Sequence, residues 1–315
     1  MQITLYTPQF KDQWDQCVRE SHSGCFLHER DFMEYHAHRF EDHSLMFFDN
    51  DTFVACFPAH IIDKSLKSHK GLTYGSFLIS TYACQASDHP KFYRALTKEL
   101  IDYAKAEDLA ILNLKLPPQY YNPNFNAEWL TLKNNSFETS QESVDLVVDL
   151  TQEWQPSPKK TIGYRNGKFE KLRLMKDVHL KNFWSDLLEP QLMARHQARP
   201  VHSIEEIELL QQLFPDQILQ YGVEVDDMLV AGITLFDFGN ILKIQYAAAN
   251  KQGFEHNAMD FLYLEIIKEA KEQKKEFVDL GTVNHPDGSV NKGLKRFKQQ
   301  LGATTTSVFE LTLSL

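Results

Sequence analysis

The chain has 315 residues, of which 43% are hydrophobic and 24% charged, so it is long enough for two domains and typical of a folded globular protein. Its net charge of -10 disfavours a general nucleic-acid-binding protein, because phosphate binding needs clustered lysine and arginine. No apolar run approaches the roughly 18–20 residues of a membrane-spanning helix, and residues 1–6 lack a signal-peptide pattern. We therefore expect a cytoplasmic protein.

The four cysteines are Cys17, Cys25, Cys56 and Cys84, and all four lie in the first third of the chain. Their spacing is not that of metal ligands, so we interpret them as buried free thiols in a reducing compartment. Histidines 36, 38 and 43 form no completed ligand set either, and we expect no metal.

The first half of the chain predicts a hairpin, a third strand, a helix and a closing strand. Residues 45–48 and 52–57 are apolar runs on either side of a polar turn, which is typical of a hairpin. Residues 74–79 form a third apolar segment. A helix is predicted next, because apolar residues recur at helical spacing at Phe92, Leu96, Leu100 and Ile101. Residues 109–114 are expected to form the last strand.

The second half predicts the same order of elements. Strands are expected at residues 219–225, 228–235, 241–249 and 277–280. A helix precedes the last of them, with one apolar face formed by Met259, Leu262, Tyr263, Ile266 and Ala270. Sequence identity between the halves is negligible, so only the order of elements is shared.

A basic segment with two glycines, residues 157–168, and two helices within residues 183–214, split near Pro200, lie between these groups of strands. We expect a domain boundary near residue 150. This gives an N-terminal domain of residues 1–150 and a C-terminal domain of residues 151–315.

The last forty residues contain a buried strand that ends in Gly281, a polar loop, and a short cationic segment over residues 291–303. The run Gly293-Leu294-Lys295-Arg296-Phe297-Lys298, closed by Gly302, resembles the C-terminal signature of the Fem-like group of the GNAT acyltransferase superfamily. The resemblance implies an α/β (α+β) fold of tandem GNAT-like domains, with mixed sheets flanked by helices and one composite cleft. It also implies acyl transfer to an amine or hydroxyl.

In the Fem-like pattern, the lysine equivalent to Lys298 stabilises the charge that develops on the tetrahedral intermediate. The alternative is a solvated lysine on an amphipathic helix. Asp279, at the end of its strand, is a candidate to orient Lys298 or to bind an acceptor hydroxyl. The alternative is that Asp279 is simply a turn cap. Phe297, the aromatic residue before the lysine, is a candidate substrate contact.

Residues 195–203 are similar to those of acyltransferases linked to bacterial surface-polysaccharide genes. His196 is a candidate general base, because imidazole titrates near neutral pH, and Arg195 and His202 are candidate substrate contacts. The alternatives are a buried histidine satisfied by the backbone and a residue that leads into a helix. Ser203 and Glu206 form a capping-box pattern, which already gives Ser203 a structural role.

A second segment of the same resemblance, residues 68–76, contains His69, Thr73 and Tyr74 as candidate acceptor contacts. It can equally be a loop that enters a strand. The place of the GNAT pyrophosphate turn is residues 250–258, where Gly253, His256, Asn257 and Ala258 are candidate cofactor-binding residues. The full motif is absent, and Glu255 is acidic where a phosphate would bind.

Three functions follow as hypotheses. The first is transfer of an acyl group from acyl-CoA to the amine or hydroxyl of a sugar or sugar-nucleotide, for cell-surface polysaccharide. The second is a Fem-like aminoacyltransferase that uses aminoacyl-tRNA on a peptidoglycan-type acceptor. The third is a non-catalytic GNAT-like protein that binds a ligand.

Overall fold

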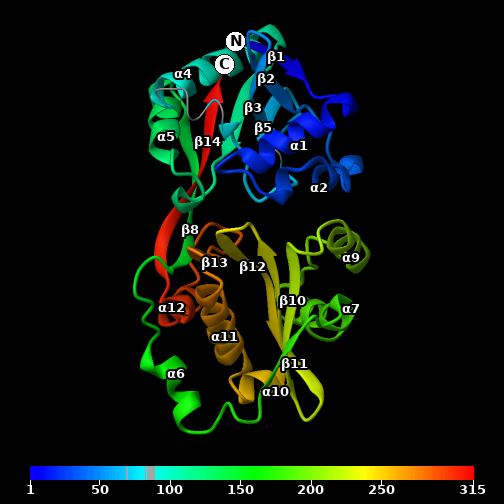
Figure 1. Ribbon diagram of the computed structural model, residues 1–315, viewed down its shortest axis with the longest axis vertical. Coiled ribbons are helices and arrows are strands. Elements are labelled where there is room, and N and C mark those ends of the chain that lie inside the picture. Colours follow the sequence, from blue (N-terminus) through cyan, green and yellow to red (C-terminus); the bar gives the residue numbers. More distant parts are fainter. Residues whose placement is uncertain (69, 82, 84–88) are drawn as a thin grey trace. The chain divides into compact units, whose positions relative to one another are not determined.

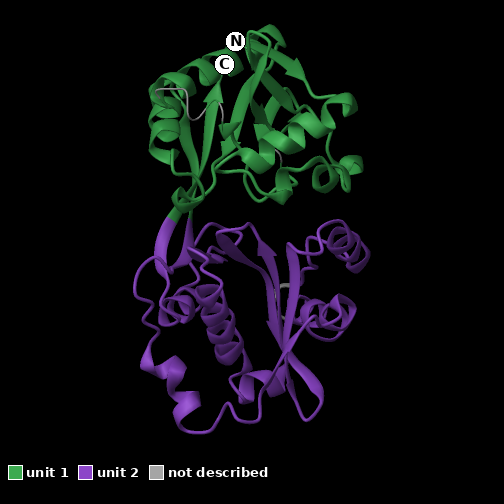
Figure 2. Cartoon of the chain, in the orientation of Figure 1, with its two compact units in different colours: residues 1–143, 307–315 green, residues 144–306 purple. Residues whose placement is uncertain are grey.

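The computed structural model describes residues 1–68, 70–81, 83 and 89–315, which form two compact units (Figure 2). Unit 1 contains residues 1–143 and 307–315, and unit 2 contains residues 144–306. Two strands, β8 (Glu138–Asp149) and β14 (Thr304–Ser314), each begin in one unit and end in the other. The predicted domains differ from these units, because residues 307–315 return to unit 1.

Unit 1 contains one small sheet and a second set of paired strands. The small sheet has the order β1-β2-β3-β6, and its members are β1 (Gln2–Leu5), β2 (Leu45–Asp49), β3 (Thr52–Phe57) and β6 (Leu78–Ile79). The second set has the order β4-β5-β7-β14, with β4 (Ala59–Ile62), β5 (Ser65–Ser68) and β7 (Ile111–Lys115). β5 and β7 pair in parallel. The pairs β1–β2, β2–β3, β3–β6, β4–β5 and β7–β14 are antiparallel.

The helices of unit 1 pack on these strands (Figure 1). They are α1 (Lys11–Glu20), α2 (Arg30–Glu34), α4 (His89–Ala106) and α5 (Phe125–Asn134), with 3₁₀ turns at Pro8–Phe10, Phe26–His28, Ala37–Arg39 and Gln119–Tyr121. The predicted helical face is confirmed for Leu96 and Leu100, which are fully buried in the core of this unit. Cys17, Cys25 and Cys56 are buried, and Cys84 lies outside the described residues.

Unit 2 is built around a mixed sheet of the order β8-β13-β12-β11-β10-β9. Its strands, besides β8, are β9 (Arg173–Lys176), β10 (Ile218–Val225), β11 (Met228–Asp237), β12 (Ile241–Ala249) and β13 (Phe277–Thr282). β12 and β13 are parallel, and their neighbours pair antiparallel.

Helices cover both faces of this sheet (Figure 1). They are α6 (Pro158–Arg165), α7 (Leu180–Phe183), the π-helical turn η5 (Trp184–Leu188), α8 (Glu189–His196), α9 (Ile204–Leu213), α10 (Lys251–Glu255), α11 (Ala258–Glu272) and α12 (Lys292–Gln300). α11 buries its apolar face in the core of unit 2, whereas Phe183 packs so closely on β11 that Gly232 has no room for a side chain. None of the described helices is both long and apolar enough to cross a bilayer.

The predicted order of elements is confirmed in unit 2, where β10, β11, β12, α11 and β13 follow one another. In unit 1 the predicted hairpin, helix and closing strand are present as β2–β3, α4 and β7. The predicted strand at residues 74–79 is wrong in extent, because only Leu78 and Ile79 pair, with β3. The hairpin β4–β5 lies between β3 and β6 in the chain and was not predicted.

Candidate functional site

The two parallel strands of unit 2 separate after a single short stretch of pairing. β12 and β13 are in register from Ile241 with Phe277 to Lys243 with Asp279. Immediately afterwards both strands are irregular: β12 shifts register against β11 between Ile244 and Tyr246, and β13 shifts against β8 between Asp279 and Gly281. Because bulges bend and twist a strand, they direct the two strand ends apart.

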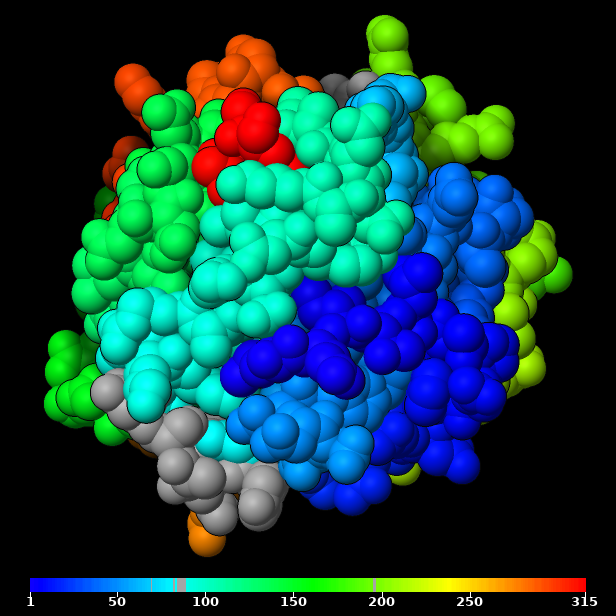
Figure 3. All heavy atoms as spheres, turned by 90° about the horizontal axis from the view of Figure 1, so that it is seen from above, coloured from blue at the N-terminus to red at the C-terminus, as the bar shows by residue number. Residues whose placement is uncertain are grey.

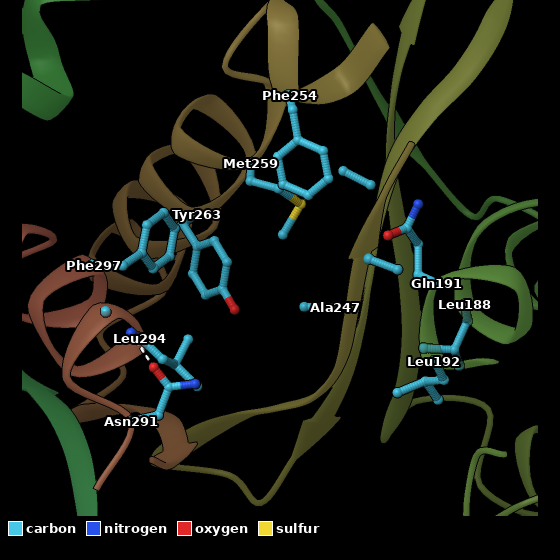
Figure 4. Close-up of a pocket in the computed structure, with 13 residues that line it drawn as sticks. Leu188, Gln191, Leu192, Ala247, Phe254, Met259, Tyr263, Asn291, Leu294 and Phe297 are labelled. Carbon is cyan, nitrogen blue, oxygen red and sulfur yellow. Dashed lines mark hydrogen bonds between the residues drawn. The ribbon is translucent and has the colours of Figure 1, made fainter. Parts of the chain in front are cut away.

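A cavity of about 500 Å³ lies beside the part of β12 that extends beyond this pairing (Figure 4). Its walls come from the end of β12, from α10 and α11, from α12 with the residue before it, and from η5 and α8. The lining residues are Leu188, Gln191, Leu192, Ala247, Ala248, Ala249, Phe254, Met259, Tyr263, Asn291, Gly293, Leu294 and Phe297. No charged residue is among these described lining residues, so the wall is apolar apart from a few neutral polar groups. This is the character of a small-molecule site.

Local sequence features hold the cavity walls in place. Asn291 is the N-cap of α12, and its side-chain oxygen accepts a hydrogen bond of 3.0 Å from the Leu294 N–H. Phe297, one turn along, meets the ring of Tyr263 edge-on, with 5.5 Å between the ring centroids. The Lys160 ammonium lies 3.9 Å from the centroid of the Phe297 ring and pairs with Asp260 at 2.6 Å. The predicted substrate contact Phe297 therefore lines the cavity.

A cluster of buried charges lies where β12 and β13 part. Lys243 Nζ is 2.7 Å from Asp279 Oδ2, and Asp279 Oδ1 accepts a 2.6 Å hydrogen bond from the Gly281 N–H. Lys298 Nζ donates to the carbonyl oxygens of Gly281 at 2.8 Å and Thr282 at 3.1 Å. Burial lowers the pKa of Lys298 to about 8, helped by Lys243 and opposed by the carboxylates of Asp145 and Asp279.

The predicted catalytic residues Lys298 and Asp279 thus lie in one cluster, joined through the Gly281 peptide groups. Lys298 does not line the cavity among the described residues, and it is not a solvated surface lysine either, since its side chain is buried. The sequence did not indicate Lys243 as a site residue, because its ion-pair partner, Asp279, is 36 residues away in the chain. The one signal for it is a lysine inside an apolar strand.

The predicted cofactor-binding residues lie in α10, in the turn that follows it and at the start of α11. Asn250 caps α10, and its side chain accepts a 2.9 Å hydrogen bond from the Gly253 N–H. A Cβ at Gly253 would lie 2.3 Å from the Val230 carbonyl oxygen, which gives this glycine a packing role. His256 and Asn257 form the turn itself, Asn257 with a positive φ, and Ala258 is fully buried. They are neighbours in sequence of the lining residues Phe254 and Met259.

His202 is buried near the bulge of β12. Its Nδ1 lies 2.6 Å from the hydroxyl oxygen of Tyr246, and its carbonyl oxygen accepts a 3.2 Å hydrogen bond from Trp184 Nε1. Burial raises the pKa of Tyr246 to about 12. The predicted capping box at Ser203 and Glu206 is confirmed in both directions. The side chains of Arg195 and His196, at the end of α8, lie outside the described part of the chain.

The remaining predicted residues belong to unit 1, whereas the cavity lies within unit 2. His69 lies outside the described residues, Thr73 is half-buried, and Tyr74 is buried. The Tyr74 carbonyl oxygen is 3.1 Å from His28 Nε2. Two residues on, the Ser76 hydroxyl donates to the carboxylate of buried Glu128, and burial raises the pKa of that carboxyl to about 7.

Comparison with known proteins finds solved structures that have a similar fold. The chain is similar to FemX along its whole length, with 12% identity, a TM-score of 0.72, and coverage of 100% of this chain and 98% of that one. It is also similar to L-PGS from Bacillus licheniformis, with 13% identity, a TM-score of 0.57, and coverage of 97% and 91%.

A third similar structure is a tandem GNAT protein from the clavulanic acid biosynthesis pathway, at 12% identity, a TM-score of 0.53, and coverage of 99% and 98%. No protein-family model and no curated protein sequence matches the chain. The predicted fold class is confirmed: the protein has a mixed α/β fold of the tandem GNAT type.

Proposed function

We propose that the protein is an acyltransferase that moves an acyl group from a thioester donor, acyl-CoA, to an amine or hydroxyl of an acceptor. The observation that carries the proposal is the apolar cavity of about 500 Å³ beside the separated end of β12. A strand end without its neighbour presents backbone N–H groups that can bind a polar ligand, and the cavity next to it can hold the acyl end of a donor.

The proposed reaction is a direct displacement. The acceptor nitrogen or oxygen attacks the thioester carbonyl carbon, the new C–N or C–O bond forms, the C–S bond breaks, and coenzyme A leaves as a thiol after it receives the proton that the nucleophile loses. Backbone N–H groups and a buried cation can stabilise the oxyanion. In this proposal His196 takes the proton, Lys298 supplies the positive charge and Asp279 positions it. The acceptor class is an amino sugar or sugar-nucleotide of cell-surface polysaccharide.

The second candidate is an aminoacyltransferase that uses aminoacyl-tRNA, and its support is the similarity to FemX over the full length of both chains. The cavity chemistry favours the first candidate. An aminoacyl group carries an α-ammonium, and burying it without a carboxylate partner is costly. None of the described lining residues is acidic.

A thermal-shift titration with CoA, acetyl-CoA, longer acyl-CoAs and a charged tRNA tests the donor. A ligand at a hundredfold excess over its dissociation constant adds about 2.7 kcal/mol of stability to the folded state, so a specific donor raises the unfolding midpoint clearly. Ala247→Trp, which fills the cavity from an exposed strand position, should abolish the shift. Met228→Trp, on an exposed end of β11, is the matched control and should preserve it. If charged tRNA alone raises the unfolding midpoint, the aminoacyl-tRNA-dependent function replaces the acyl-CoA-dependent one.

A further inference from the structure

Tyr263 is a buried tyrosine whose hydroxyl is directed into the cavity. It lies on α11, its side chain is 5% exposed, and Figure 4 shows its hydroxyl oxygen pointing into the open space. Among the residues that the structure describes, this hydroxyl makes no hydrogen bond, and burial raises its pKa above the ordinary value for tyrosine. The hydroxyl can be reached from the cavity, so a group that binds there can supply the hydrogen-bond partner that the described residues do not.

Asn291 adds a second donor from a different element. Its side-chain oxygen is already used as the N-cap of α12, where it accepts from the Leu294 N–H. The amide nitrogen is therefore the group left to face a ligand, and Figure 4 shows it on the cavity side. Within the described part of the chain no acceptor is bonded to that nitrogen. Two neutral hydrogen-bond donors, from α11 and from the start of α12, thus point into one apolar cavity.

The residues that line the cavity indicate the chemical character of the rest of the ligand. Phe254 and Leu294 both line the cavity, and they are 45% and 38% exposed, which is high for large apolar side chains. Ala247, Ala248 and Ala249 keep the opposite wall shallow. Isolated exposed apolar residues need no explanation, but two at one cavity indicate that an apolar ligand covers them.

We propose that Tyr263 and Asn291 donate hydrogen bonds to the carbonyl oxygen of the donor's acyl thioester, and that the cavity wall selects an uncharged, hydrocarbon acyl chain longer than acetyl. This inference rests on the proposed acyltransferase function and names its donor class. Neutral donors suit a carbonyl acceptor, whereas a carboxylate or an ammonium on the acyl chain would find no opposite charge among the described lining side chains.

Tyr263→Phe separates this role from a structural one, because it removes the hydroxyl and keeps the ring that packs on Phe297. Without ligand, the variant should unfold at nearly the same temperature as the wild type, since the hydroxyl has no hydrogen bond to a described residue that the substitution would remove. Its affinity for octanoyl-CoA should fall about 5–30-fold, which is the effect of one lost hydrogen bond. Tyr164→Phe is the matched control, because the Tyr164 hydroxyl donates to Glu265 and does not line the cavity. It should leave the affinity unchanged.

Asn291→Asp tests the second donor, because it keeps the oxygen that caps α12 and replaces the amide nitrogen by an acceptor. Binding of octanoyl-CoA should weaken while the fold stays intact. A lower unfolding temperature for Tyr263→Phe without ligand, or unchanged binding in both variants, would overturn the assignment of these donors.

A series of donors tests the acyl class on the wild-type protein by calorimetry. Affinity should rise from acetyl-CoA through butyryl-CoA to octanoyl-CoA, and succinyl-CoA should bind more weakly than butyryl-CoA. Equal affinity across the series would overturn the acyl-chain inference and leave the proposed acyl-CoA-dependent function standing. Binding of no CoA compound at all would reject that donor and the inference together.

Discussion

Lys243 and Asp279 are register partners on adjacent parallel strands, and their side chains form a buried ion pair with 2.7 Å between Nζ and Oδ2. They are also the last residues of β12 and β13 that pair, so the ion pair marks the point where the strands part. The Asp279 side chain has no exposed surface. A charge in this position is expensive without its partner, so each residue of the pair depends on the other.

We expect Lys243→Met to reduce the free energy of unfolding by about 3–5 kcal/mol, because it removes the ion-pair partner of the buried Asp279 carboxylate. Combining it with Asp279→Asn should recover most of this loss, since the amide oxygen still accepts from the Gly281 N–H. Urea denaturation measures both values. Lys98→Met, which breaks an exposed pair with Asp102, is the control and should leave the free energy of unfolding nearly unchanged. An equally small effect at Lys243 would contradict the buried pair.

Lys298 predicts a pH dependence of stability. Its pKa is about 8 in the folded protein and 10.5 ordinarily, so the folded state disfavours the ammonium. The stability tied to this group is complete above pH 10.5 and is lost as the pH falls through 8. Between pH 7.5 and 9.5 the wild type should therefore gain about 2 kcal/mol relative to Lys298→Met. Urea titrations at the two pH values test this, and a constant difference would rule it out.

Lys298 is also predicted to contribute to the activity of the protein. If Lys298 stabilises the oxyanion, Lys298→Met should lower kcat by about a hundredfold or more with little change in donor affinity. Lys298→Arg, which keeps the charge, should retain more activity. Full activity in the methionine variant would limit Lys298 to its observed contact with the Gly281 and Thr282 carbonyl groups.

Gly253→Ala tests whether the glycine of the α10–α11 turn is required by packing. The new Cβ would lie 2.3 Å from the Val230 carbonyl oxygen, so β11 and α10 must shift. We expect a loss of about 1–3 kcal/mol in unfolding free energy without any ligand present. Gly293→Ala is the control, because its nearest neighbour would be Asn291 Oδ1 at 3.5 Å, and alanine favours the helix. An unaltered stability for Gly253→Ala would leave ligand approach as the reason for the glycine.

Glu128→Gln should stabilise unit 1 increasingly as the pH rises. The pKa of Glu128 is raised from 4.5 to about 7, mainly by burial, so the folded state favours the neutral acid. Its stabilising contribution is complete below pH 4.5 and is lost as the pH rises through 7. The advantage of the glutamine variant over wild type should grow by about 2–3 kcal/mol between pH 4.5 and 8. The same substitution at exposed Glu138 is the control, and a parallel response of both variants would refute the effect.

The sequence predicted unit 2 more completely than unit 1, for a physical reason. In unit 2 the strands β10, β11 and β12 are mostly buried and apolar, and a clear turn at Asp226-Asp227 separates the first two, so their positions follow from composition. The short strand β9 begins and ends with an exposed basic residue and was not predicted. In unit 1 the β4–β5 hairpin turns at Asp63 and Lys64, both with positive φ, although neither is a glycine or asparagine. Half of β8 is exposed and polar, from Glu138 to Glu142, so no apolar pattern reveals it.

The candidate site was only partly predictable. Phe297 and Lys298 came from a resemblance to one motif, and Asp279 from its position at a strand end. In the structure Phe297 lines the cavity, and Lys298 and Asp279 lie where β12 and β13 separate. The hydroxyl of Tyr263 could not be predicted, because its helical spacing marks it as an ordinary core residue. Only the fold shows that this hydroxyl faces open space and not packed side chains.

Unit 2 is a single uninterrupted segment, whereas unit 1 is assembled from two segments that lie on either side of it in the chain. The last of these contributes the end of β14, which pairs with β7 and buries Leu311 completely; Figure 3 shows its end, in red, on the surface of unit 1.

A growing polypeptide therefore completes every described strand and helix of unit 2 before β14 can pair with β7. A released chain of residues 1–306 should yield a protease-resistant unit 2 and a protease-sensitive unit 1. During synthesis, residues 1–143 can thus complete their native unit only after all of unit 2 has been made, when residues 307–315 become available.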